Sequence, residues 1–86
     1  MKIRVVTMGR HYHENEGLPE FLELQEAASL DDAIDRLGEL LSPGASFPGS
    51  CLIAVSGKHV GTIASHSAVS LGDGDELMLL APVAGG

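Results

Sequence analysis

The stretch "SLDDAIDRLGELL", Ser29 to Leu41, has the most regular pattern of the sequence. Its apolar residues recur three and four positions apart, which places them on one face of a helix: Leu30, Ala33, Ile34, Leu37 and Leu41. Ser29 is a good N-cap, and Asp32 completes a shortened capping box. A helix with a single apolar stripe can cover only one face of a sheet, so the pattern predicts an α+β domain.

Two further features of the sequence concern the predicted helix, one at its end and one inside it. The sequence Ser42-Pro43-Gly44 is expected to end it, because proline and glycine do not continue a helix. Gly38 lies inside it and lowers the stability of a helix by about 1 kcal/mol relative to alanine. We interpret Gly38 as a point where the helix approaches the sheet closely.

Strand patterns precede the helix. The run "KIRVVTM", residues 2–8, is rich in β-branched residues and alternates between two faces. The run "LPEFLELQE", residues 18–26, alternates in the same way and predicts a half-exposed strand. The two runs are expected to form a hairpin with a long polar loop.

Further strand patterns follow the helix. The run "CLIAV", residues 51–55, is continuously apolar and predicts a central strand, followed by a turn at 56–58 and a short return strand at 59–64. The run "LGDGDE", residues 71–76, predicts a tight turn, and "ELMLL", residues 76–80, predicts the last strand. The expected architecture is therefore a sheet of four or five strands with one main helix packed across it.

Composition bounds the function. The chain has 86 residues, of which 44% are hydrophobic, which suits one small domain with an aliphatic core. Its net charge of −7 argues against nucleic acid and anionic membrane surfaces, and it favours basic partners. The single cysteine excludes an internal disulfide. No apolar run is long enough to span a bilayer, and the first residues lack the pattern of a signal peptide, so we expect a cytoplasmic protein.

The segment "LGDGDELMLLAPVAGG", Leu71 to Gly86, resembles the end of the small subunit of molybdopterin synthase. That family has an L-x-D-G-D-E turn, an apolar strand and a Pro-Pro-Val-x-Gly-Gly tail, and residues 73–76 and 82–86 match it. The stretch "LIAVSG", residues 52–57, also resembles a strand of that family that ends in Val-Asn. The sequence departs from the family at Ala81, at Ser56 and over "MGRHYHENEG", residues 8–17. The related thiamin sulfur carrier usually lacks the Pro-Val-x-Gly-Gly form.

The resemblance implies a ubiquitin-like β-grasp fold with a mixed sheet over residues 1–81, followed by a flexible tail at residues 82–86. It further implies that an E1-like adenylating enzyme uses ATP and Mg²⁺ to activate the carboxylate of Gly86. A persulfide or sulfide then converts this group into a thiocarboxylate that donates sulfur. The implied partners are that enzyme, a larger molybdopterin synthase subunit, and a sulfur donor such as a cysteine desulfurase or rhodanese. The chain itself is expected to be a non-catalytic carrier that binds no cofactor and no metal.

The chemistry of the tail agrees with this role. Gly85 and Gly86 have no Cβ, so they fit a narrow tunnel in a partner enzyme. Pro82 lacks an N–H and is expected to end strand pairing, while Val83 offers a hydrophobic anchor beside Ala84. Five extended residues reach at most roughly 17 Å.

The last strand predicts a second part of the site. Leu77 and Leu79 alternate with Met78 and Leu80, and only one pair can face the helix. The other pair, which we take to be Met78 and Leu80, is expected to form an exposed apolar patch that continues into the tail, binds partners and is surrounded by acidic residues.

Other residues are expected to have no chemical role. The His11-Tyr12-His13-Glu14 cluster is interpreted as a polar loop, Cys51 as a small buried hydrophobe, and His59 and His66 as surface residues without partners. The carboxylates at 73, 75 and 76 are expected in a β-turn, because they lack the length and spacing of a calcium loop. Asp31, Asp32 and Asp35 are expected on a solvated helix face.

Three alternatives stay open. A protein modifier joined through Gly86 to lysines would use the same activation step. A sulfur carrier could also serve another pathway, such as thiamin or cysteine synthesis. An interaction module with an inert end would need none of this chemistry.

Overall fold

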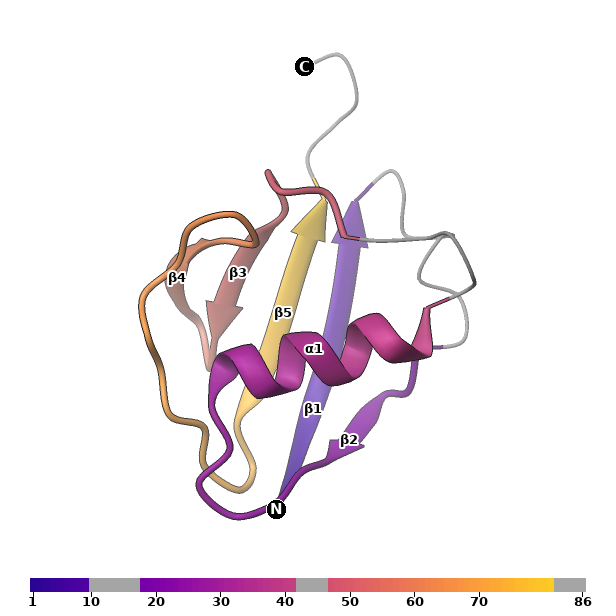
Figure 1. Ribbon diagram of the computed structural model, residues 1–86, viewed down its shortest axis with the longest axis vertical. Helices are drawn as coiled ribbons and strands as arrows, with labels where there is room; N and C mark the ends of the chain where they lie inside the picture. The colour runs from indigo at the N-terminus through magenta and orange to yellow at the C-terminus, as the bar shows by residue number, and fades with distance from the viewer. Residues whose placement is uncertain (10–17, 42–46, 82–86) are drawn as a thin grey trace.

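The computed structural model describes residues 1–9, 18–41 and 47–81. These residues form one five-stranded sheet with a helix lying across one face of it (Figure 1). Along the chain the elements are β1 (Lys2–Gly9), β2 (Phe21–Glu23), α1 (Leu30–Leu40), β3 (Leu52–Val55), β4 (Lys58–Thr62) and β5 (Glu76–Ala81). The predicted α+β class and element order are confirmed.

The sheet is mixed, with the spatial order β2-β1-β5-β3-β4. The first and last strands, β1 and β5, run parallel side by side in its middle, with Val5 opposite Leu77 and Thr7 opposite Leu79. The other strand pairs are antiparallel, and they include the predicted β1–β2 hairpin. This arrangement confirms the β-grasp fold that the resemblance implied.

The core lies between α1 and the sheet. The helix buries Leu30, Ala33 and Leu37, three of the five residues of the predicted stripe. The inward-facing residues of the strands pack against them, as strand alternation predicts: Ile3, Val5, Leu22, Ile53, Val55, Leu77 and Leu79. The Cα radius of gyration is 12.0 Å, close to the roughly 12 Å expected for a chain of this length.

The helix begins as the sequence predicts. The Asp32 N–H donates to Ser29 Oγ over 3.1 Å, and the Ser29 N–H donates to Asp32 Oδ2 over 2.9 Å. This reciprocal pair is a complete capping box. At the other end, the predicted stop at residues 42–44 lies outside the described residues. No helix within the described ranges is long and apolar enough to cross a membrane.

The ends of two strands differ from the prediction. β2 has only the three residues Phe21–Glu23, because the chain turns before Ala27, which has a φ of 64°. β4 begins at Lys58 because Ser56 and Gly57 form the two-residue hairpin turn, with φ values of 48° and 85°. It ends at Thr62, where the next turn starts.

The interpretation of Gly38 as a point of close approach is wrong. Gly38 is exposed, and a Cβ added to it would meet no other heavy atom within 4 Å. The glycine therefore weakens the helix without serving its packing. We expect Gly38→Ala to raise the free energy of unfolding by about 0.5–1 kcal/mol, measured by urea denaturation. A lower stability of the variant would contradict this account of the helix.

Candidate functional site

The position of β5 determines where the C-terminal segment leaves the fold. β5 pairs with β1 on one side and β3 on the other, so it is a central strand of the sheet (Figure 1). Leu77 and Leu79 are fully buried beneath α1, which fixes the strand in the core. Near its end, Leu80 lies between Met8 and Leu52 of the neighbouring strands. The attachment point of the C-terminal segment is thus held on three sides.

The predicted tail residues Pro82, Val83, Ala84, Gly85 and Gly86 lie outside the described residues. Their proposed roles in sulfur chemistry and partner binding therefore stay predictions. The structure describes the strand that precedes them, β5, which ends at Ala81.

The Asp-Gly-Asp-Glu sequence forms a β-turn at the opposite end of β5. The Asp75 N–H donates to the Gly72 carbonyl over 3.0 Å, and Gly74 takes the positive φ of 87°. Asp75 Oδ2 accepts from the Gly72 N–H at 2.7 Å, and Asp73 Oδ1 accepts from the Lys2 N–H at 2.7 Å. The carboxylates of Asp73 and Asp75 accept hydrogen bonds from backbone N–H groups, so the predicted β-turn is confirmed for these two residues, whereas Glu76 lies in β5.

Ser56 extends this network to the β3–β4 hairpin. Its hydroxyl donates to Asp75 Oδ1 over 2.8 Å and accepts from the Glu76 N–H at 3.2 Å. The Ser56 N–H donates to the Glu76 carbonyl over 2.7 Å. Ser56 stands where the resembling family has Asn, and its hydroxyl holds the start of β5 in place.

An apolar surface lies on the sheet face opposite α1. We name it the open-face patch; its six residues are Val6, Met8, Leu52, Ala54, Met78 and Leu80. The strand registers place them in two adjacent rows across β1, β5 and β3. Met8 is 49% exposed and Leu80 is 37% exposed. The predicted outward orientation of Met78 and Leu80 is confirmed, while partner binding by the patch stays a prediction.

The open-face patch contains a shallow groove. The groove has a volume of about 100 Å³ and is lined by Leu52, Ile53, Ala54, His59, Met78 and Leu80. Because Leu80 is one residue from the end of β5, the groove lies beside the point where the C-terminal segment begins. The apolar surface and the tail are therefore adjacent parts of one candidate site.

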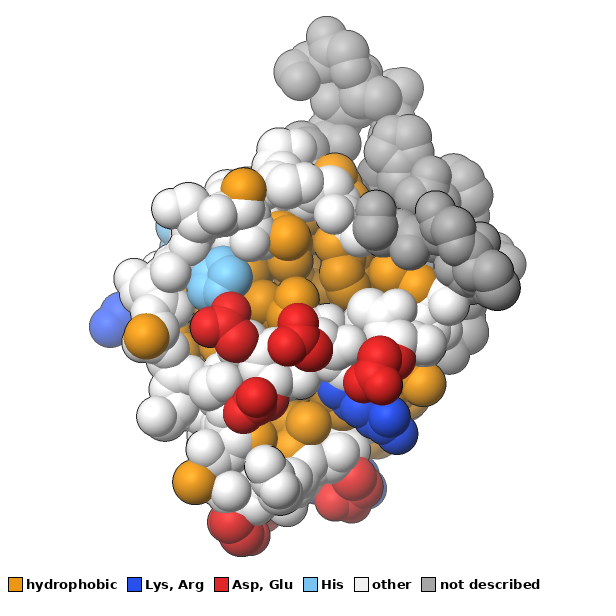
Figure 2. Space-filling model, viewed as in Figure 1, with side chains coloured by type: hydrophobic (Ala, Val, Ile, Leu, Met, Phe, Trp, Pro, Cys, Tyr) orange, Lys and Arg blue, Asp and Glu red, His pale blue; other side chains and the backbone are white. Residues whose placement is uncertain are grey.

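The expected acidic surroundings of the patch are found only in part, because Glu23 and Glu76 share the open face with the basic residues Lys2 and Arg4 opposite them. Charges of both signs occupy the open face at β1 and β2: the Lys2 ammonium lies 4.5 Å from the centroid of the Phe21 ring, and Arg4 lies 4.0 Å from Glu20. Acidic side chains also gather on the helix face (Figure 2), at Asp31, Asp32, Asp35 and Glu39. The patch therefore has charged neighbours of both signs, and the cluster of four acidic side chains lies on the other side of the sheet.

Cys51 is 2% exposed, and burial raises the pKa of its thiol. Its predicted role as a small buried hydrophobe is confirmed, since a protonated thiol is a poor nucleophile. The His11–Glu14 cluster lies outside the described residues. Within the described ranges, no group of three or more metal-ligating side chains occurs.

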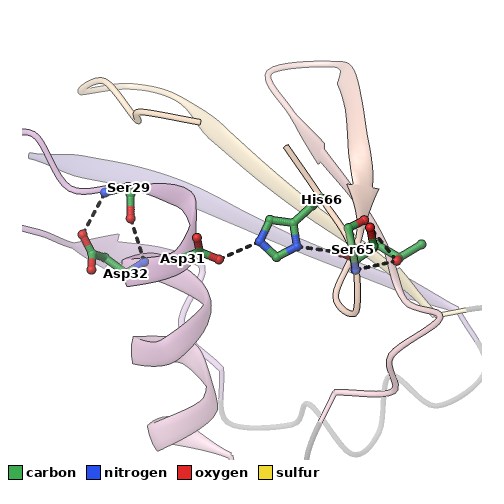
Figure 3. A network of polar contacts seen from close by, with 6 residues as sticks. Ser29, Asp31, Asp32, Ser65 and His66 are labelled. Atoms are coloured by element: carbon green, nitrogen blue, oxygen red, sulfur yellow. Dashed lines mark hydrogen bonds and ion pairs between the residues drawn. The ribbon is translucent and has the colours of Figure 1, made fainter. Parts of the chain in front are cut away.

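The expectation that His66 lacks a partner is wrong. Its Nε2 lies 2.6 Å from Asp31 Oδ1, and its Nδ1 lies 2.7 Å from the Thr62 carbonyl oxygen (Figure 3). Asp31, Asp32 and Asp35 are exposed, as predicted, and Asp32 caps the helix, but Asp31 additionally binds His66. His66 and Asp31 are 35 positions apart, so no local pattern could reveal this contact. The prediction of surface exposure is confirmed for His59.

A comparison with known families gives one finding for this chain. A family model described as the ThiS family matches residues 9–86. The matched range includes β2, the helix, the last three strands and the C-terminal segment. A comparison with curated proteins found no match.

Proposed function

The chain belongs to the ThiS family of ubiquitin-like sulfur carriers, and from this premise we propose that it is the sulfur-carrying small subunit of a molybdopterin synthase. The observation that carries the proposal is the Pro82-Val83-Ala84-Gly85-Gly86 tail directly after a strand that follows an Asp-Gly-Asp-Glu turn. Residue 86 would hold the transferred sulfur.

The proposed chemistry takes place at the carboxylate of Gly86. A carboxylate oxygen attacks the α-phosphate of ATP in an E1-like enzyme, and pyrophosphate leaves. A sulfide then attacks the acyl carbon and displaces AMP, which leaves a thiocarboxylate. If a persulfide attacks instead, the product is an acyl disulfide, and a thiol must reduce its S–S bond to release the thiocarboxylate.

The fold supports this chemistry by positioning the tail. Carriers of this family work with E1-like activating enzymes and with biosynthetic partners. Each partner must hold the carrier so that residue 86 reaches its own active site. The open-face patch lies beside the end of β5, and exposed apolar surfaces of this kind mark partner sites. We therefore assign docking to the patch and acyl transfer to the tail.

The docking assignment predicts the effect of Leu80→Asp. Leu80 is 37% exposed, so the charge would remain hydrated in the free carrier but would be buried in a complex. We expect affinity for the activating enzyme or the synthase partner to fall roughly tenfold to a hundredfold, measured by calorimetry.

Leu40→Asp is the matched control for this experiment. Leu40 is 39% exposed, but it lies on α1, which covers the other face of the sheet. The control should bind like the wild type, apart from a small loss of helix stability caused by an acidic residue at the negative end of the helix. Equal affinity of Leu80→Asp and the wild type would remove the patch from the proposed site.

A transfer experiment tests the pathway. The carrier is loaded with radioactive sulfur at residue 86 and offered a pterin acceptor with a molybdopterin synthase large subunit, or the thiazole precursor of thiamin with its own synthase. The proposal predicts labelled pterin. Labelled thiazole alone would assign the carrier to thiamin synthesis, and label joined to lysines of other proteins would assign it to protein modification.

A further inference from the structure

His66 lies where the segment after β4 meets the helix. This segment, residues 63–69, is tied to β4 by the Ser67 N–H, which donates to the Val60 carbonyl over 3.0 Å. It is tied to the start of α1 by the Leu30 N–H, which donates to the Val69 carbonyl over 2.8 Å. A cleft of about 540 Å³ lies between β4 and residues 67–69. The segment therefore forms one wall of this cleft.

The backbone around Gly61 fixes the position of His66. Gly61 has a φ of 136°, and a Cβ added to it would lie 2.6 Å from the Cα of His66. The Thr62 hydroxyl accepts from the Ser65 N–H at 3.2 Å and so holds the intervening turn. The imidazole consequently reaches α1 from a tightly packed turn, and its side chain is only 12% exposed.

The partners of the two ring nitrogens determine the protonation state of His66. Nδ1 faces the carbonyl oxygen of Thr62, and Nε2 faces the carboxylate of Asp31 (Figure 3). Both partners accept hydrogen bonds, whereas a neutral imidazole has only one N–H to donate. Two donated bonds require the imidazolium ion. The geometry of these two contacts therefore favours the protonated form of His66.

We propose that His66 is a proton-dependent clamp that fastens the cleft wall at residues 63–69 to helix α1 and loosens when the imidazolium loses its proton. This inference concerns the fold of the carrier and does not depend on the identity of its sulfur acceptor. Loosening would widen the cleft between β4 and residues 67–69.

The groups around His66 act in the direction that the clamp requires. The hydrogen bond that the His66 ring donates to Asp31 is the largest influence, and it raises the pKa of His66 together with the backbone hydrogen bonds to Thr62 and Ile63. Desolvation opposes this shift. The positive end of a helix also disfavours a cation beside it, so the start of α1 acts in the same opposing direction. Because the folded pKa is raised, the stabilisation is complete below the ordinary histidine value of about 6.5 and is lost as pH rises through the folded value.

The pKa of His66 is measured by NMR titration of its ring in the full chain. We expect His66 to titrate above an unfolded histidine and Asp31→Asn to lower its pKa, because Asn keeps an acceptor oxygen but removes the charge. A pKa at or below the ordinary value in the wild type would overturn the proposal.

Amide hydrogen exchange measures how firmly residues 63–69 are held. The exchange rate of the Ser67 N–H, corrected for the intrinsic effect of pH, should rise roughly two- to fivefold as His66 loses its proton, a modest change because Asp31 is 67% exposed. His66→Gln should remove this pH dependence, and His59→Gln, which changes an exposed histidine on β4, should keep it. The same pH dependence in His66→Gln and in the wild type would also overturn the proposal.

Discussion

Adding one alanine after Gly86 is expected to reduce sulfur transfer more than a hundredfold without changing the stability of the domain. The added residue moves the terminal carboxylate by roughly 3.5 Å. A displacement of about 1 Å at a reacting centre already lowers a rate by about a hundredfold. The change lies beyond β5, which the Asp73–Asp75 turn and the buried Leu77 and Leu79 hold in place. Thiocarboxylate formation is measured by mass spectrometry, and stability by thermal unfolding.

Two further variants and a control accompany this experiment. Deletion of Gly86 shortens the reach, and Gly85→Val adds bulk where a narrow tunnel is expected, so both should also be inactive. Ala84→Gly keeps the length of the tail and should retain activity. An extended chain that remains active, with no protease present to trim it, would show that residue 86 is not the acyl donor.

Gly61→Ala is expected to cause the largest loss of stability, about 3 kcal/mol or more. The φ of 136° at Gly61 is unfavourable for any residue with a Cβ. In addition, the new methyl group would overlap the Ser65 carbonyl and would lie 2.6 Å from the Cα of His66. The turn would have to move away from β4, which would also break the contact between His66 and Asp31. The free energy of unfolding is measured by urea denaturation.

Gly57→Ala separates the cost of the positive φ from the cost of the steric overlap. Gly57 also has a positive φ, 85°, but a Cβ there would meet nothing within 4 Å. Its substitution should lower stability by only about 1–2 kcal/mol, from the backbone conformation alone. Equal losses for the two variants would mean that the close contact at Gly61 has no energetic effect.

Much of the fold could be predicted because each element carries its own local pattern. The apolar stripe of α1 and the alternation of β1 and β5 assign residues to the core before any tertiary contact is known. The capping box at Ser29 and Asp32 depends on residues three positions apart, so the sequence also reveals where the helix begins.

The errors arose where distant segments meet. Asp31 precedes the β3–β4 hairpin in the sequence and His66 follows it, so no periodic pattern relates the two residues. The acidic surroundings of the patch were predicted only in part, because the basic residues that pair with Glu23 and Glu76 are determined by the strand registers. The other acidic side chains gather on the helix face (Figure 2). The opposite error occurred at Gly38, where a packing role was inferred although the residue is exposed.

The candidate site was only partly predictable. The outward orientation of Met78 and Leu80 followed from strand alternation, but the rest of the open-face patch depends on the pairing of β5 with β1 and β3. The Asp-Gly-Asp-Glu motif helped to identify the family, yet its carboxylates hold the start of β5, the end away from the tail. The functional role therefore rests on the residues after β5 and on the patch beside them.

The most direct test of the account is the intact mass of the chain after incubation with an E1-like enzyme, ATP, Mg²⁺ and a sulfur donor. The account predicts a product in which one oxygen atom is replaced by one sulfur atom, located at Gly86 by fragmentation and absent when ATP is omitted. An unchanged mass, measured with an activating enzyme that binds the chain and converts its own carrier, would contradict the central claim that this protein carries sulfur on its terminal glycine.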